Sequence, residues 1–219
     1  CDPSRKWKEQ EEQNILDSEA DRIVPVFRTG INYQAGRYTY LRASFGQGYR
    51  FPSIAEKYAS TTLGSVAIFP NPFVEPESGW SSEAGIRQGI AFGKFTGQAD
   101  LALFFSQNKN MIEYLFQGAT PEGAGFTAFN VEKSRIYGTE TEIVLNRKTD
   151  KTSLILTAGY TFIYPIDLSA WSNSGTMSYL KFRRKHSGKI SVTYEWKRTD
   201  LSLSLYARSK TLNIDDVFL

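Results

Sequence analysis

Strict alternation of apolar and polar residues constrains the fold of this chain more than any other feature. It is clearest in one segment, where the two kinds of residue separate completely: Ile190, Val192, Tyr194 and Trp196 against Lys189, Ser191, Thr193, Glu195 and Lys197. A period of two places successive side chains on opposite faces of a β-strand. After a turn at Lys197 to Asp200 the pattern returns, with Leu201, Leu203, Leu205 and Ala207 on the apolar side. The two segments predict a β-hairpin with one apolar face.

Six further segments alternate in the same way, and none of the chain shows a convincing helical pattern. Their apolar positions are Phe27, Ile31 and Tyr33; Leu41, Ala43 and Phe45; Trp80, Ala84 and Ile86; Phe95, Ala99, Leu101, Leu103 and Phe105; Thr139, Thr141, Ile143 and Leu145; and Leu154, Leu156, Ala158, Tyr160, Phe162 and Tyr164. The sequence therefore predicts an all-β fold, an antiparallel meander of about eight strands.

The connections between these segments alternate between short and long. Short turns are expected near Ala35 to Gly36, Gly93 to Lys94, Asn146 to Lys151 and Arg198 to Thr199, whereas residues 50–78, 108–127 and 165–185 form long links. In an antiparallel meander this order sorts all tight turns to one end of the sheet and all long loops to the other. Outer-membrane barrels are arranged in this way, whereas a soluble sandwich has no reason to sort its loops.

The chemistry of the two faces agrees with a membrane barrel. Aromatic residues on the apolar face gather near the strand ends: Tyr33, Phe92, Phe95 and Trp196 at the short-turn end, and Phe45, Trp80, Phe105 and Tyr164 at the other. Such positions are typical of interfacial girdles. The opposite face carries Arg42, Glu83, Arg87, Asp100, Glu140, Glu142, Glu195 and Arg208, which a wet lumen tolerates. We expect the strands to form part of a large transmembrane β-barrel.

Composition and charge exclude several other classes of protein. Lys and Arg exceed Asp and Glu by 26 to 23, too even a balance to indicate nucleic acid as a partner. No apolar run approaches the length of a transmembrane helix, but this test does not detect the shorter, alternating strands of a membrane barrel.

The N-terminal segment differs from the rest of the chain. Cys1 is the single cysteine, and it suggests either a fragment boundary, which we favour, or a lipidated N-terminus. Residues 1–21 hold ten charged side chains and are expected to form a solvated loop or tail, with the strand-rich domain spanning 22–219.

Three motifs make the interpretation more specific. The first is Ser44-Phe45-Gly46-Gln47-Gly48-Tyr49-Arg50-Phe51-Pro52-Ser53-Ile54-Ala55-Glu56; the second is Asn71-Pro72-Phe73-Val74-Glu75-Pro76-Glu77 followed by Trp80-Ser81-Ser82-Glu83-Ala84-Gly85; the third is Tyr137-Gly138-Thr139-Glu140. In this order and spacing they resemble the signatures of TonB-dependent outer-membrane receptors. The signature positions are Gly46, Gly48, Tyr49, Arg50, Pro52, Asn71, Pro72, Pro76, Glu77, Glu83, Gly85, Gly138 and Glu140.

The resemblance implies a function in transport. A receptor of this family sits in the cell outer membrane, binds a scarce nutrient such as a siderophore, vitamin or glycan, and imports it with energy from the TonB complex of the inner membrane. Its partners would be outer-membrane lipid, a plug domain, the remaining barrel strands and an unknown nutrient ligand. About eight strands in 219 residues imply roughly 600 residues for a barrel of 22 strands, so this chain would supply about a third of it.

Candidate ligand contacts are aromatic residues in the long loops, and no catalytic residue is expected. Tyr58, Phe69, Phe116 and Trp171 carry rings that stack on sugars, chelates or corrin-like rings. Strand glycines such as Gly46 and Gly48 leave the sheet face bare for a close neighbour, which in the family is the plug. His186, the single histidine, lies near no recognisable nucleophile, and we expect no metal or cofactor. The basic run ending at Lys185, beside Tyr179, is favoured as a solvated charge cluster over a contact with lipopolysaccharide phosphate.

Two alternatives remain open at the level of sequence. One is a complete, closed eight-stranded outer-membrane barrel that acts as an anchor or adhesin. The other is a soluble β-rich binding domain. A small closed barrel must fill its interior with side chains, whereas Gly46, Gly48, Gly85, Gly138 and Gly159 keep the presumed inner face thin, which favours the large barrel.

Overall fold

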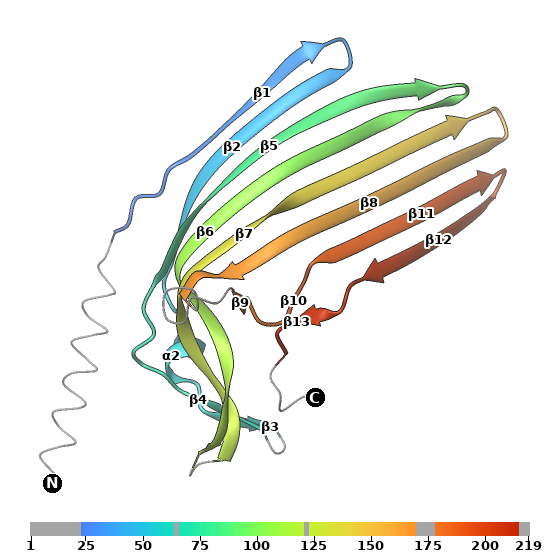
Figure 1. Cartoon of the computed structure of the whole chain (residues 1–219). Coiled ribbons are helices and arrows are strands. Elements are labelled where there is room, and N and C mark those ends of the chain that lie inside the picture. Colours follow the sequence, from blue (N-terminus) through green and yellow to red (C-terminus); the bar gives the residue numbers. More distant parts are fainter. Residues whose placement is uncertain (1–22, 64–65, 121–122, 170–177, 215–219) are drawn as a thin grey trace, which may run out of the picture.

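Eight long strands form one antiparallel sheet in chain order. The computed structural model describes residues 23–63, 66–120, 123–169 and 178–214, so the charged segment 1–21 and Cys1 lie outside the described residues. The strands are β1 (Arg28–Gly36), β2 (Thr39–Arg50), β5 (Glu77–Phe92), β6 (Phe95–Thr120), β7 (Gly123–Lys148), β8 (Thr152–Asp167), β11 (His186–Trp196) and β12 (Thr199–Arg208). Each pairs with its neighbour in the order β1-β2-β5-β6-β7-β8-β11-β12, and the sheet curves strongly (Figure 1). The predicted meander is confirmed.

The described sheet is open. β1 pairs only with β2 and β12 only with β11 among the residues that the structure describes. A closed eight-stranded barrel would require β1 and β12 to pair with each other, so these strands do not form one.

The remaining elements are short and lie at one end of the sheet, opposite the end that carries the tight turns (Figure 1). They are α2 (Ile54–Tyr58), β3 (Thr61–Leu63), β4 (Val66–Phe69), β9 (Ser178–Tyr179), β10 (Arg183–Arg184) and β13 (Thr211–Leu212). We call this the loop end. β4 pairs in parallel with β7, where Phe69 lies opposite Thr127, and so fixes the first loop against the β6–β7 hairpin.

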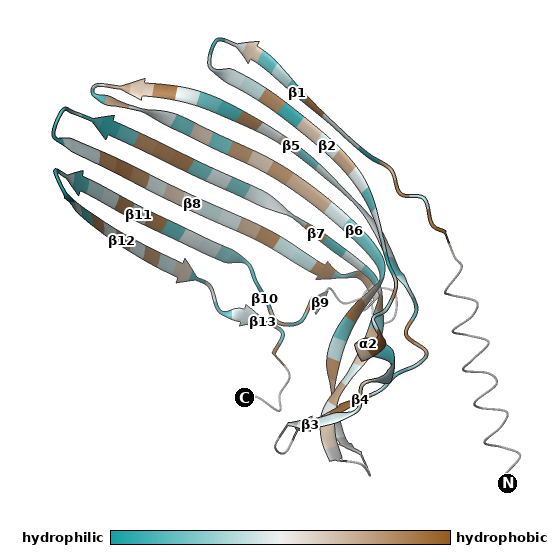
Figure 2. Cartoon of the chain, turned by 180° about the vertical axis from the view of Figure 1, so that it is seen from behind, coloured by the Kyte–Doolittle hydropathy of each residue, from teal (hydrophilic) through white to brown (hydrophobic). Residues whose placement is uncertain are grey.

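The two faces of the sheet differ as the alternation predicts, and we call them the apolar face and the polar face. Leu103, Ile190, Leu203 and Leu205 lie on the apolar face and are 56%, 58%, 62% and 64% exposed. Figure 2 shows the alternation of hydrophobic and hydrophilic residues along the strands. Side chains of this kind would be buried in a soluble domain, so a soluble β-rich module does not fit. No helix in the described part of the chain is long and apolar enough to cross a membrane.

The few buried apolar side chains lie mostly at the loop end. Val74, Ile166 and Leu180 are at most 5% exposed, and Ala67 in β4 and Ala128 in β7 are buried as well. Packing in this protein therefore secures the loops, while the sheet itself is held by its hydrogen-bond ladders.

The aromatic residues expected at the loop end form one group on the apolar face. Phe45, Phe105 and Tyr164 fall in one register row, which also holds Tyr137, a residue that the prediction did not include. The ring of Trp80 stacks on Phe45 and Phe105, with centroids 5.9 and 5.1 Å apart.

Three local predictions are wrong. Residues 108–127 are not a loop, because β6 and β7 continue through most of them. Apolar residues occur there on both faces, so the period of two is hidden in the sequence, and the β6–β7 register shifts only between Gln117 and Thr120. The first turn lies at Arg37 and Tyr38, two residues later than expected. A helix, α2, exists although none was expected, for a reason given below.

Candidate functional site

A cluster of ion pairs centred on Arg42 crosses three strands of the polar face. Arg42 donates its Nε to Glu83 at 3.0 Å and both terminal nitrogens to the two oxygens of Asp100 at 2.8 and 2.7 Å. Arg87 donates its Nε to the same carboxylate at 3.0 Å. Two parallel bonds to one carboxylate fix the guanidinium in both position and orientation. The cluster therefore ties β2, β5 and β6 together at mid-strand.

Two glycines of the polar face make room for these and other side chains. A Cβ on Gly85 would lie 2.7 Å from Cζ of Arg42, so this glycine lets the guanidinium lie flat across β5. A Cβ on Gly138 would meet the carbonyl oxygen of Phe162 and lie 2.8 Å from the Phe104 ring. Gly85 and Gly138 were expected to keep the inner face thin, but side chains of neighbouring strands cover them.

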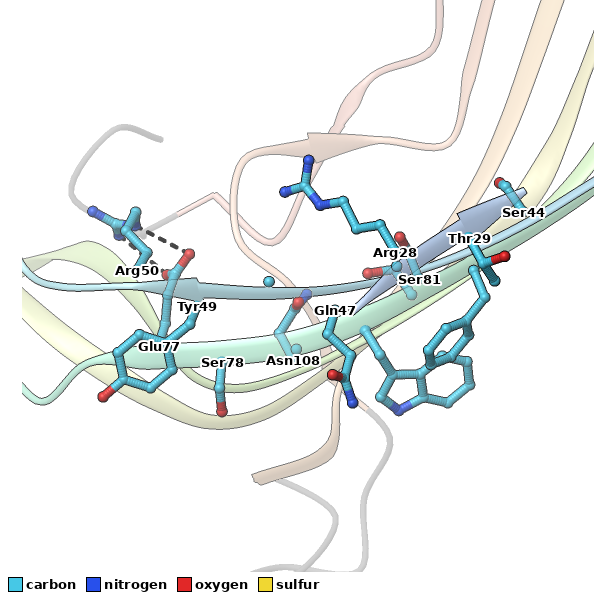
Figure 3. Close-up of a pocket in the computed structure, with 16 residues that line it drawn as sticks. Arg28, Thr29, Ser44, Gln47, Tyr49, Arg50, Glu77, Ser78, Ser81 and Asn108 are labelled. Carbon is cyan, nitrogen blue, oxygen red and sulfur yellow. Dashed lines mark hydrogen bonds and ion pairs between the residues drawn. The ribbon is translucent and has the colours of Figure 1, made fainter. Parts of the chain in front are cut away.

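Gly46 and Gly48 do leave a bare strip, as expected. A Cβ on Gly48 would touch nothing within 4 Å, and one on Gly46 would meet only Cγ of Arg28 at 3.5 Å. They lie in an open hollow of about 540 Å³ between Arg28 and Arg50 (Figure 3). Arg28 and Arg50 project from one side of the sheet, and Gln47 and Tyr49 from the other (Figure 3). This hollow is a part of the polar face that a neighbouring backbone could approach.

Arg50 joins the first loop to the sheet. It donates to both oxygens of Glu56 at 2.9 Å and to Glu77 at 3.1 Å. Glu77 also accepts from the backbone N–H of Ile112 at 3.0 Å. Arg50 and Glu77 lie opposite each other in β2 and β5, while Glu56 belongs to α2. We call Arg50, Glu56 and Glu77 the Arg50 cluster; its role is to hold α2 over the ends of three strands.

Helix α2 begins at a capping box that the sequence contains. The Ser53 hydroxyl accepts from the Glu56 N–H at 3.2 Å, and the Ser53 N–H donates to the Glu56 carboxylate at 2.7 Å. Serine followed three residues later by glutamate is a recognised start signal, and Pro52 just before it restricts Phe51 to an extended conformation. The helix escapes prediction because five residues are too few to show an apolar period.

The Glu56 carboxylate is more acidic than an ordinary glutamate. Burial raises its pKa, but hydrogen bonds from Ser53 and the Arg50 guanidinium outweigh burial, and the pKa lies below its usual value. A lowered pKa in the folded state means that ionised Glu56 stabilises the loop above the pH range where a free glutamate titrates. That stabilisation is lost as the pH falls through the lowered pKa.

We expect Glu56→Gln to increase the opening of residues 53–59 roughly fivefold to tenfold at neutral pH, since it removes a capping contact and an ion pair. Amide hydrogen exchange of this segment measures the opening. Acidification should produce the same increase in the parent protein but little further change in the variant. Glu142→Gln, a carboxylate of β7 far from α2, is the control; equal exchange in the two variants would contradict the assignment.

The segment from Asn71 to Glu77 is clamped onto the β6–β7 hairpin. Asn71 donates to the carbonyl of Ala128 at 2.9 Å. Asn130 accepts from the Glu75 N–H at 2.8 Å and donates to its carbonyl at 2.9 Å, and Asn110 donates to the Glu75 carboxylate at 2.7 Å. Pro72 and Pro76 restrict the residues before them to extended conformations, and these amides fix the segment in place. No group of three His, Cys, Asp or Glu in the described residues could hold a metal ion.

Comparison with known proteins gives this geometry a family. The family model described as "TonB dependent receptor-like, beta-barrel" matches residues 14–216. The chain belongs to the TonB-dependent receptor β-barrel family. The strand-rich fold is therefore part of a TonB-dependent receptor barrel; its apolar face is the outside and its polar face the lumen.

Individual relatives are distant and considerably longer. The vitamin B12 transporter BtuB of Vibrio vulnificus is 24% identical over 204 residues, which cover 82% of this chain and 31% of that protein. The siderophore receptor PirA from Pseudomonas aeruginosa has a TM-score of 0.56 at 15% identity, covering 83% of this chain and 33% of that one. A mutant of the ferric enterobactin receptor PfeA, also from Pseudomonas aeruginosa, has a TM-score of 0.58 at 16% identity, covering 85% and 28%. The chain thus spans about a third of the length of the proteins it matches.

The candidate ligand contacts of this TonB-dependent receptor barrel lie at the loop end. Phe69 ends β4, half-buried, and Phe116 stacks edge-on against Phe126 across the β6–β7 hairpin with centroids 5.5 Å apart. Tyr58 ends α2 and is half-buried. Trp171 lies outside the described residues. Phe69 and Phe116 share the β4–β7–β6 layer, but they fall in adjacent register rows, so their side chains lie on opposite faces of it.

The signature residues divide by role. Arg50 and Glu77 build the Arg50 cluster; Glu83 and Gly85 hold Arg42; Gly46 and Gly48 line the bare strip. Tyr49 faces away from the lumen and packs edge-on against Phe51, with centroids 5.1 Å apart. Glu140 lines a second hollow of the polar face together with Arg42 and Asp100. The sequence predicted Arg42, Arg87 and Asp100 only as luminal charges. The spacing of Glu83 and Gly85, a carboxylate and a glycine on the same face, was the signal for a cationic side chain that lies across Gly85.

Proposed function

We propose that this chain is part of an outer-membrane importer that binds a scarce nutrient at its loop end and admits it with energy supplied through TonB. One observation carries the proposal: the same sheet has an exposed apolar face with aromatic residues near its strand ends and an opposite face lined by charged residues and glycines. Lipid would cover the apolar face, and the protein would act in the cell outer membrane. Relatives named as a vitamin B12 transporter and a siderophore receptor support a nutrient of that kind.

The open edges of the sheet support a larger assembly. The outer edges of β1 and β12 are unpaired among the described residues, and exposed strand edges of this length are otherwise liable to aggregate. Further barrel strands would pair with both edges, and a plug domain would fill the lumen beside the bare strip at Gly46 and Gly48. Residues 22–219 would then form one part of a single barrel domain, with 1–21 as a solvated loop.

The loop end supplies the chemistry for binding rather than for bond making. An aromatic ring among Tyr58, Phe69, Phe116 and Trp171 would stack on a planar or cyclic ligand. The Arg50 cluster and the clamp at Asn71 and Glu75 would hold these loops in shape, which lowers the entropy lost on binding.

Uptake by cells that carry the full-length receptor tests the proposal. Labelled ferric siderophore and cobalamin would be offered to cells with and without its gene, before and after a protonophore collapses the inner-membrane gradient. We expect gene-dependent accumulation that the protonophore abolishes, while binding at the surface persists. Accumulation that survives the protonophore would show that the energy has another source.

Binding by variants tests the loop end separately. We expect Phe116→Ala to weaken ligand binding by about tenfold, the loss typical of one aromatic contact. Phe92→Ala is the matched control, because Phe92 is 82% exposed at the tight-turn end of the same sheet. Equal affinity in the two variants would remove Phe116 from the site.

A further inference from the structure

The turn between β11 and β12 contains a residue that its own backbone conformation disfavours. Two residues, Lys197 and Arg198, join Trp196 to Thr199, and Lys197 has a φ of 54°. The turn between β5 and β6 also has two residues, and there the first is Gly93, with a φ of 59°. Glycine adopts such left-handed angles without steric cost, whereas lysine does not. Lys197 therefore makes its turn less stable than a glycine would, which indicates a role for its side chain outside the turn.

Lys197 belongs to a group of three cationic residues on two adjacent turns. Its backbone N–H donates to the carbonyl of Lys151 at 3.4 Å, so the β11–β12 turn lies against the β7–β8 turn. Thr149 closes the β7–β8 turn, because its hydroxyl lies 2.7 Å from that of Thr152 and its N–H donates to the Thr152 carbonyl at 2.8 Å. We call Lys151, Lys197 and Arg198 the turn cluster, and all three residues are exposed.

No carboxylate neutralises the turn cluster within the described residues. Arg42 and Arg50 on the polar face pair with carboxylates at 2.7 and 2.9 Å, whereas no member of the turn cluster forms an ion pair in the part of the chain that the structure describes. Asp150 lies in the β7–β8 turn but makes no ion pair with the cluster. Glu195 and Asp200 lie opposite each other in the register, on the polar face of the sheet. The turn cluster therefore presents positive charge that lacks an anion.

The cluster lies where the apolar face of the sheet ends. Nζ of Lys197 lies 4.9 Å from the centroid of the Trp196 ring. Trp196 belongs to the apolar face and is 49% exposed, and Leu201 continues this face from the next strand at 68% exposed. An indole ring is apolar in its body and polar at its N–H, so it suits the boundary between lipid tails and headgroups. The cation above it is therefore at the level of the headgroups.

The same combination of a cation and a ring occurs at other tight turns. The Arg37 guanidinium lies 5.3 Å from the centroid of Tyr38 in the β1–β2 turn, and that of Arg147 lies 5.9 Å from the centroid of Phe95 beside the β5–β6 turn. Neither arginine has a carboxylate partner among the residues described. Figure 1 shows the tight turns together at one end of the sheet, so these pairs follow a single rim.

We propose that the turn cluster binds an anionic phospholipid, with the lipid phosphate held by Lys151, Lys197 and Arg198 and the acyl chains against Trp196 and Leu201. Charge complementarity requires an anion, and the exposed apolar surface beside the cations requires an apolar tail on the same molecule. An acidic protein would supply only the charge. The tight turns of outer-membrane barrels face the periplasm, so the lipid would belong to the periplasmic leaflet. This inference goes beyond the proposed import function, since the cluster lies at the end of the sheet opposite the loop end.

Native mass spectrometry of the full-length receptor in mild detergent tests the proposal, with phosphatidylglycerol and phosphatidylethanolamine as probes. The two lipids share a phosphate and acyl chains but differ in net charge. We expect the parent protein to prefer phosphatidylglycerol. Lys197→Gly should weaken binding of this lipid about fivefold, the effect of one cation beside an anionic surface, and adding Lys151→Gln should bring the loss to roughly thirtyfold. Binding of phosphatidylethanolamine should be weak and the same in all variants.

Lys197→Gly also separates a binding role from a structural one. Because glycine relieves the left-handed strain, this variant should resist urea at least as well as the parent while it loses the preference for phosphatidylglycerol. Lys197→Arg keeps the charge and should keep the preference. Lys189→Gln is the matched control, because Lys189 is a cation of the same strand that lies on the polar face, over the Tyr206 ring. It should leave lipid binding unchanged.

Several results would overturn the proposal. Equal affinity of the parent for the two lipids would show that the charge of the cluster selects nothing. Unchanged binding in Lys197→Gly, or an equal loss in Lys189→Gln, would remove the turn cluster from the lipid site. Displacement of phosphatidylglycerol by millimolar inorganic phosphate would show that the apolar surface contributes nothing. Lower resistance of Lys197→Gly to urea would show that the lysine stabilises its turn, which contradicts the argument from backbone strain.

Discussion

Gly138→Val is expected to prevent correct assembly of the barrel. A Cβ at this position would collide with the Phe162 carbonyl oxygen of the next strand and would lie 2.8 Å from the Phe104 ring. Gly138 pairs with Phe104 in β6 and with Ile163 in β8, so relief would require β7 to move away from both neighbours. Overpacking of this kind costs about 1–3 kcal/mol where a core can adjust, and more where rigid backbone is the obstacle.

The measurement is the fraction of receptor that shows heat-modifiable mobility after extraction from the outer membrane. We expect that fraction to fall several-fold in Gly138→Val. Gly48→Val is the matched control, because Gly48 is also a signature glycine of a luminal strand position and a Cβ there touches nothing within 4 Å. Normal assembly of Gly138→Val, or an equal defect in Gly48→Val, would show that the crowding at Gly138 is not decisive.

The contrast between these two glycines shows what the sequence could and could not predict. Alternation placed both residues on the same face, because side-chain direction follows the period of two. It gave no information on what crosses that face from a neighbouring strand. Gly138 is covered by Phe104 and Gly85 by Arg42, whereas Gly48 is open, and only strand register distinguishes the three.

The order of the strands was predictable from the alternation of apolar and polar residues, whereas the continuation of β6 and β7 beyond the membrane was not. One lipid-facing and one wet face enforce alternation along the membrane-spanning part of every strand. Beyond the membrane, the β6–β7 hairpin packs against β4 and the segment around Val74, which is 1% exposed, so both of its faces accept apolar residues. The alternation disappears there although the strands continue.

The candidate site was predicted as a set of residue types and not as contacts. The motifs identified Arg50, Glu83 and Asn71, because their order along the chain is specific. Their partners at Glu56, Arg42 and Ala128 are 6, 41 and 57 residues away, and sheet pairing brings the two distant ones into contact. Ser53 followed by Glu56 was the one local signal that could have revealed α2.

Arg42→Met is expected to destabilise the barrel more than any other single change to a luminal charge. It removes three hydrogen bonds from one guanidinium and leaves the Glu83 carboxylate without its cation, while Asp100 keeps only Arg87. The Asp100 side chain is 14% exposed, so water replaces the lost bonds incompletely. With the Arg42 side chain itself 31% exposed, we expect a loss of about 2 kcal/mol after discounting for solvent screening.

Urea unfolding of the receptor in lipid vesicles, followed by tryptophan fluorescence, measures this loss. Arg87→Met is the matched control and should cost much less, because Arg87 makes one bond to Asp100 and its side chain is 53% exposed. Adding Asp100→Asn to Arg42→Met should restore part of the stability, since it removes the charge left with too few partners. Two results would contradict this interpretation: an equal loss of stability in Arg42→Met and Arg87→Met, or a double variant whose loss is the sum of the losses of Arg42→Met and Asp100→Asn. In either case the ion pair between Arg42 and Asp100 does not hold β2 to β6. The Glu83–Gly85 signature must then be explained by a contact other than Arg42.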